Sequence, residues 1–190
     1  MARLVKSSII IPALWIAFFT FIAGLVLGLG LETFIATVEN TLLSSCALVV
    51  VILLGIVTDA IGTAATAADI VPFNSMAAKK VPGAREAVKI VSNADLVANV
   101  TADVGGDIAG TLSGAIGASI VYAIGRKFEL HDIVLLGAAM TSLIAALTVG
   151  GKTIGKSLAI TYADDIVFRV AKVLRWWESL TGIELFTGRR

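Results

Sequence analysis

The 190-residue chain is 57% hydrophobic and 15% charged, and its mean hydropathy is +0.94. Soluble domains carry about 25% charged residues, so this composition excludes a soluble enzyme and predicts an integral membrane protein. The formal net charge of +1 says little about partners, because the positions of the charges matter more than their sum.

Four uncharged stretches are long enough to cross a bilayer, which takes about 20 apolar residues in a helix. We therefore predict an all-α integral membrane protein, a single membrane domain over residues 1–190, with about four transmembrane helices and amphipathic juxtamembrane helices. Thirteen of the fifteen Lys and Arg residues lie on the side of the two termini, which positive-inside bias places in the cytoplasm, with the chain in the cytoplasmic membrane. The predicted transmembrane helices cover residues 8–31, 42–68, 96–124 and 133–149.

Two segments outside these helices are amphipathic. Residues 70–95 contain Pro72 and the pair Pro82-Gly83, which predict short juxtamembrane helices lying against the bilayer. Residues 163–180 alternate apolar and charged positions at helical spacing and end near Trp176 and Trp177, which predicts an interfacial helix bound to membrane lipid. A basic segment beside a membrane favours lipid over nucleic acid as its partner.

The helix over residues 96–124 carries a glycine at every fourth position, Gly106, Gly110 and Gly114. Such a row lets another helix approach closely in a bilayer, and we expect it to pack against a second copy in a homodimer. A second row of small residues runs beside it and is formed by Gly105, Ala109, Ser113 and Gly117.

Three aspartates fall within the predicted transmembrane helices, where ionisable groups are costly and mark a pathway, a partner or a helix end. Asp59 lies in the second helix, and Asp103 and Asp107 lie one turn apart on one face of the third, so the three carboxylates are candidates to converge. Carboxylates and backbone carbonyls, here those of Gly105 and Gly106, are hard oxygen ligands that suit Mg²⁺. The open alternative is that the aspartates are hydrated or paired with Lys152 and Lys156.

The chain offers no arrangement of nucleophile, base and orienting group, so we predict that it is not an enzyme. The segment Gly150-Gly151-Lys152-Thr153-Ile154-Gly155-Lys156 lacks the spacing of a phosphate-binding loop, and no strand precedes it. We therefore predict no nucleotide ligand.

The order of short motifs resembles the membrane domain of the CNNM/CorC magnesium transporters over residues 50–180. The matching stretches are Met76–Ala84, Ala87–Val91 and Gly151–Ile160, the last similar to the family pattern GExxPK(S/T)LA. The resemblance implies divalent cation transport and a homodimer. We expect the chain to lack the CBS and C-terminal domains that usually follow in the cytoplasm, because only ten residues follow the predicted interfacial helix.

Carried over residue by residue, the resemblance places Asp59 at the family's first-helix serine and Gly62 at its nearby glutamate. Gly105-Gly106 fall at the family's GN pair, Lys152 replaces its acidic residue, and Lys156 is shared. Two hypotheses follow. Either the aspartates form a relocated Mg²⁺ ligand set, or the cation of Lys152 occupies the place of the metal and pairs with Asp59 or Asp107 in a membrane scaffold that transports nothing.

Overall fold

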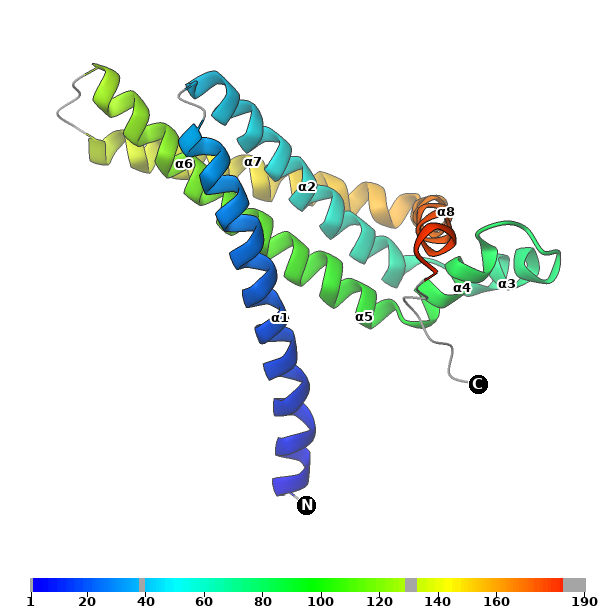
Figure 1. Cartoon of the computed structure of the whole chain (residues 1–190). Helices are drawn as coiled ribbons and strands as arrows, with labels where there is room; N and C mark the ends of the chain where they lie inside the picture. Colours follow the sequence, from blue (N-terminus) through cyan, green and yellow to red (C-terminus); the bar gives the residue numbers. More distant parts are fainter. Residues whose placement is uncertain (1, 38–39, 129–132, 183–190) are drawn as a thin grey trace. The chain divides into compact units, whose positions relative to one another are not determined.

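The computed structural model describes residues 2–37, 40–128 and 133–182, and these residues form helices with no β-strand. Four helical stretches are long and apolar enough to cross a membrane, which confirms the predicted fold class. Figure 1 shows these helices in sequence colours. The four candidate spans are Ala13–Leu31, Thr41–Ala67, Ala94–Phe128 and Ile133–Thr161.

The helices have bounds that differ in places from those expected. The first four are α1 (Ala2–Thr37), α2 (Thr41–Ala67), α3 (Ile70–Ala78) and α4 (Ala84–Ser92). The third span is built from α5 (Ala94–Ala98), the π-helix η1 (Asn99–Gly105) and α6 (Gly106–Phe128). The last two helices are α7 (Ile133–Thr161) and α8 (Ala163–Thr181).

The chain divides into two compact units, each built from two separate stretches. Unit 1 consists of Met1–Val51 and Gly110–Ile144, and unit 2 of Ile52–Ala109 and Ala145–Arg190. In unit 1, α6 buries Ile116, Ile120 and Val121, whereas the apolar residues of the α1 span are exposed. A surface of this kind is compatible with surrounding lipid, which is as apolar as the side chains themselves.

Unit 2 contains a core in which the ends of the long helices meet the short ones. Phe73 of α3 is stacked on Phe168 of α8, with 6.5 Å between the ring centroids. We call the cluster of buried apolar residues around this stack the unit 2 core. Its buried members are Ala64, Ala65, Phe73, Ala87, Ile90, Val97, Ala159, Val167 and Ala171.

Local signals explain how the chain turns between these helices. The Asp69 carboxylate accepts a hydrogen bond from the Val71 N–H at 3.0 Å and so caps the start of α3. The Asp69 N–H in turn donates to the Asp164 carboxylate of α8 at 3.0 Å, which ties the two helix starts together. Gly83 precedes α4 with φ +90°, a left-handed conformation that favours glycine.

The glycine-rich segment near residue 150 lies inside a helix. We expected the fourth transmembrane helix to end at about residue 149, but α7 continues through Gly151 and Gly155 to Thr161. Both glycines pack against Ile56 of α2, and a Cβ atom on Gly155 would lie 3.0 Å from Ile56 Cγ2. The glycines therefore make room for a neighbouring side chain, and they do not end the helix.

Candidate functional site

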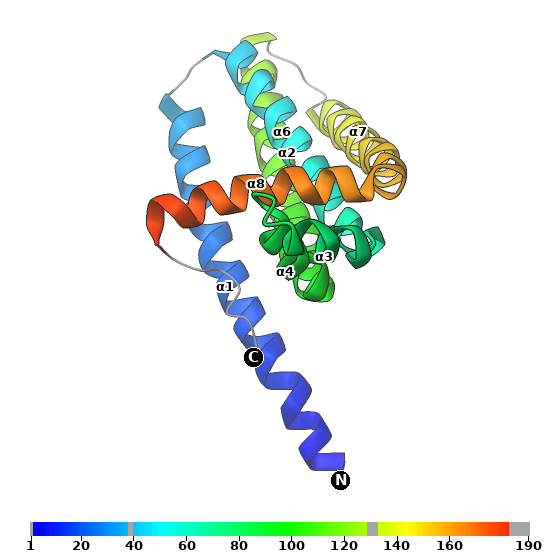
Figure 2. The same ribbon diagram turned by 90° about the vertical axis from the view of Figure 1, so that its right-hand side faces the viewer.

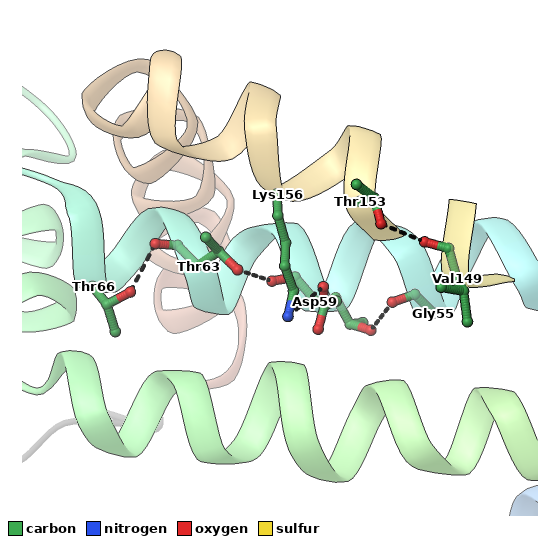
Figure 3. A network of polar contacts seen from close by, with 8 residues as sticks. Gly55, Asp59, Thr63, Thr66, Val149, Thr153 and Lys156 are labelled. Atoms are coloured by element: carbon green, nitrogen blue, oxygen red, sulfur yellow. Dashed lines mark hydrogen bonds and ion pairs between the residues drawn. The ribbon is translucent and has the colours of Figure 1, made fainter. Parts of the chain in front are cut away.

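Asp59 is a buried carboxylate in the middle of unit 2. It lies in α2 and only 4% of its surface is exposed. Its Oδ2 atom lies 3.5 Å from Lys156 Nζ of α7, while no hydrogen-bond donor reaches that oxygen within the part of the chain that the structure describes. Figure 3 shows the lysine reaching from α7 to the aspartate on α2. We call these two residues the Asp59 pair.

The two members of the Asp59 pair differ in their exposure. The Asp59 side chain is 6% exposed, but the Lys156 side chain is 52% exposed. A lysine can bury its aliphatic stem along apolar surface and keep its ammonium group near water. The protein therefore encloses the carboxylate of the pair but only about half of the lysine side chain.

Three threonines near Asp59 in the sequence or in Figure 3 donate their hydroxyl hydrogens within their own helices. Thr58 donates to the Gly55 carbonyl at 3.1 Å and Thr63 donates to the Asp59 carbonyl at 2.9 Å. Across from them on α7, Thr153 donates to the Val149 carbonyl at 2.8 Å (Figure 3). A hydroxyl that donates keeps two lone pairs, so these oxygens retain the capacity to accept a hydrogen bond or bind a cation.

Lys152 lies one turn before Lys156 and is half-buried. A Cβ atom on Gly106 would lie 3.1 Å from Lys152 Nζ, so the glycine at the start of α6 leaves room for this ammonium group. The two lysines predicted as charge partners therefore have different neighbours. Lys156 pairs with Asp59, and the ammonium of Lys152 lies beside Gly106.

Glycines bring the helices that carry these groups into close contact. A Cβ atom on Gly55 would come 2.9 Å from the Ala109 Cβ of α6, which is closer than real side chains approach. A Cβ atom on Gly62 would lie 2.8 Å from the Thr101 hydroxyl and 3.1 Å from the Ala98 Cα. One side of α2 thus packs closely against α5, η1 and α6, because its glycines leave no side chain between the helices.

One family model matches the part of the chain that carries the Asp59 pair and the glycine contacts of α2. Residues 45–183 match the family described as "Cyclin M transmembrane N-terminal domain", abbreviated CNNM. The chain belongs to the CNNM family. Comparison with curated proteins and with solved structures yields no match. The protein is thus a membrane protein of this family, and the Asp59 pair and both glycine contacts of α2 lie within the residues that match it.

The expected convergence of three carboxylates is absent from this CNNM domain as far as it is described. Asp103 in η1 and Asp107 at the start of α6 are both exposed, whereas Asp59 is buried. No group of three or more His, Cys, Asp or Glu side chains that could hold a metal ion occurs in residues 2–37, 40–128 and 133–182. The one-turn spacing in sequence could not show which face of α6 and η1 points inward.

The two small-residue rows of the third span have different surroundings. Ala109, Ser113 and Gly117 of the second row are buried, so that row forms the inner face of α6. In the predicted packing row, Gly106 faces Lys152, but a Cβ atom on Gly110 or Gly114 would meet no described atom within 4 Å. The homodimer stays a prediction, and Gly110 and Gly114 are the part of the row open to it.

Three features of the site were not predicted. They are the π-helix η1 opposite Gly62, the contact of Ile56 with the α7 glycines, and the buried Thr148 hydroxyl, for which the described chain supplies no hydrogen-bond partner. The seven-residue spacing of Gly55 and Gly62 is the signal in the sequence that indicates a small-residue face on α2.

Proposed function

We propose that this CNNM membrane domain binds and transports a divalent cation, most simply Mg²⁺, and that the cation binds at Asp59. The family is associated with divalent cation transport, which supports the general function. The Asp59 carboxylate is a hard oxygen ligand of the kind that Mg²⁺ prefers, which supports the choice of ion.

One observation carries the proposal: Asp59 is a buried acid in a candidate membrane span, and its Oδ2 has no described hydrogen-bond donor. Burial of an ionised carboxylate is costly unless a cation or donor compensates it. Lys156 at 3.5 Å compensates only part of the group, because hydrogen bonds to a carboxylate are typically about 2.7–2.9 Å long. The aspartate is therefore poised to accept a better cation.

The cargo ion has to displace Lys156 before it binds Asp59 fully. A single carboxylate that bonds to an ammonium group cannot offer the same oxygen to a metal ion. Because half of the Lys156 side chain is exposed, no described protein atom encloses it, and the ammonium can move away from Asp59 while its stem stays on α7. Asp59 thus holds the ion, and Lys156 restores neutrality after the ion has left.

Metal-dependent flux into proteoliposomes tests the assignment of Asp59. Asp59→Asn keeps the size of the side chain and removes its charge, so we expect Mg²⁺ uptake to fall to background. Asp103→Asn is the matched control, since it makes the same change at an exposed aspartate and should leave uptake unchanged. Wild-type uptake that survives in Asp59→Asn would refute the site, and no uptake of any divalent cation by wild type would refute transport.

The second candidate is a scaffold in which lysine ammonium groups replace the metal permanently. The observation that favours it is the position of Lys152 Nζ beside Gly106, close to where the resemblance places the family's metal ligands. On this hypothesis, wild type shows no change in thermal stability with millimolar Mg²⁺, whereas Lys152→Glu gains one. A wild-type stabilisation that Asp59→Asn abolishes favours the transporter.

The proposed orientation has both termini in the cytoplasm. Single cysteines introduced at Thr33 and at Lys80, in a Cys46→Ser background, test it with a membrane-impermeant thiol reagent on intact cells. We expect labelling at position 33 and none at position 80 before the cells are opened. The reverse pattern would invert the topology.

A further inference from the structure

Lys152 carries a second ammonium group within a candidate membrane span, and the Asp59 pair does not use it. The residue lies in the span Ile133–Thr161 and is half-buried. In the part of the chain that the structure describes, Asp59 pairs with Lys156, and Lys152 forms no hydrogen bond or ion pair. An ionisable group at membrane depth is costly and marks a function or a partner. The Asp59 pair therefore leaves the charge of Lys152 without an explanation.

The position of this ammonium follows from two distances to the same point. A Cβ atom on Gly106 of α6 would lie 3.1 Å from Lys152 Nζ and 4.0 Å from the Gly55 carbonyl oxygen of α2. The ammonium therefore lies at the level of Gly55. That glycine comes four residues before Asp59, which is about one turn, or roughly 6 Å, along α2.

The directions of α2 and α7 agree with this position. Gly151 contacts Ile56, and further along both helices Lys156 contacts Asp59, so within unit 2 the two helices run in the same direction (Figure 2). Lys152 precedes Lys156 by one turn on the same face of α7. It therefore lies about one turn from the level of the carboxylate.

Two ammonium groups thus lie near one buried carboxylate, and they act on it differently. Lys156 contacts Asp59 and competes directly with a cation from solution, whereas Lys152 acts on that cation only through its charge. The Coulomb energy between an ammonium group and a cation is repulsive, and it doubles when the charge of the cation doubles. A divalent cation at Asp59 is therefore repelled more strongly than a monovalent one.

We propose that Lys152 sets the affinity of the proposed cation site: its ammonium repels the divalent cation at Asp59, keeps the affinity low and speeds release of the ion. This inference rests on the proposed function, because it concerns the ion that Asp59 binds. Lys152 is not a ligand of the ion, and Gly106 leaves the room that its ammonium occupies. Transport requires binding that is weak enough for the ion to leave.

Thermal stability of the full chain at rising Mg²⁺ concentration and low ionic strength measures the affinity. Lys152→Met and Lys152→Gln remove the charge with side chains of different shape. We expect both to lower the Mg²⁺ concentration for half-maximal stabilisation at least roughly tenfold, the Coulomb effect of one ammonium on a divalent cation about one turn away even in water. Lys152→Arg keeps the charge and should stay near wild type. Lys79→Met, which removes an exposed charge elsewhere, is the control.

Mg²⁺ uptake into proteoliposomes gives a second readout. In both neutral variants we expect KM and the maximal rate to fall together, because an ion that binds more tightly leaves more slowly, whereas a merely structural defect lowers the rate without lowering KM.

The outcomes separate this inference from the proposed function. Unchanged or weaker Mg²⁺ affinity in the neutral variants, or an equal change in Lys152→Arg, would overturn the role of Lys152 and leave Asp59 as the site. Absence of any Mg²⁺ response in wild type and in both neutral variants would overturn the proposed function itself.

Discussion

Two pairs of glycines that look alike in the sequence have opposite surroundings. Gly55 and Gly62 of α2 press against neighbouring helices so closely that no side chain fits. A Cβ atom on Gly110 or Gly114 of α6 would meet no described atom of a neighbouring element within 4 Å. The comparison teaches that a small-residue row indicates only that close approach is allowed, and that tertiary structure decides whether the chain itself uses it.

The largest expected effect is at Gly62, where the clash involves backbone. Gly62→Leu should destabilise the protein by about 3 kcal/mol, the upper part of the usual range for overpacking, because Ala98 Cα of α5 cannot move aside as a side chain can. The free energy of unfolding from an SDS titration in mixed micelles measures it. A stability equal to that of wild type would mean that α2 and α5 do not approach as described.

The next largest effect is expected where α2 contacts α7 through the charges of the Asp59 pair. Lys156→Met keeps the aliphatic stem and removes the ammonium, which leaves a buried carboxylate without its cation and should cost about 1–3 kcal/mol. Asp59→Asn combined with Lys156→Met should recover most of this loss, because the double variant buries no charge. Lys79→Met, at an exposed lysine, is the control. If the double variant loses the sum of the single effects, the two residues do not interact.

A smaller difference separates Gly55 from Gly106. Gly55→Ala forces the new Cβ against the Ala109 Cβ and should cost about 1 kcal/mol or more. Gly106→Ala meets only the flexible end of Lys152, so its effect should stay within about 0.5 kcal/mol. The same SDS titration compares them, and equal losses at both positions would show that Lys152 is held rigidly beside Gly106.

The smallest effect on folding is expected at the open glycines. Gly110→Leu and Gly114→Leu should change the free energy of unfolding by no more than about 0.5 kcal/mol, since each side chain enters open space. If the row binds a second copy, the same substitutions should abolish crosslinking between copies in the membrane. Crosslinked dimers that persist in both variants would place the dimer contact elsewhere.

The four spans could be predicted because a bilayer imposes a length and an apolar composition that the spacing of charges shows directly. The end of α7 could not, since Gly150 and Gly151 are typical of a helix end, and only the contact of Gly151 with Ile56 shows why the helix continues. The π-helix η1 has no residue signature of its own. It follows from how the third span fits against α2.

The residues of the candidate site could be predicted from the sequence, but most of its geometry could not. Asp59 was singled out because ionisable groups are rare within apolar helices, and Lys156 was named as a charge partner for the aspartates. Which lysine reaches Asp59 depends on the register of α2 against α7, because Lys152 and Lys156 lie one turn apart on the same face. That register is set by the contacts of Gly151 and Gly155 with Ile56, which involve no charge and leave no charge pattern in the sequence.

If Asp59 binds the cation as we propose, Lys156 is a competitor that is attached to the protein itself. Because its ammonium is attached to α7 by a short chain and lies 3.5 Å from Asp59, its effective concentration at the carboxylate is set by side-chain length and stays constant. At the proposed cation site, a cation from solution therefore has to displace an ammonium group whose local concentration is fixed. Changes at position 156 should alter this competition without altering the ligands of the ion.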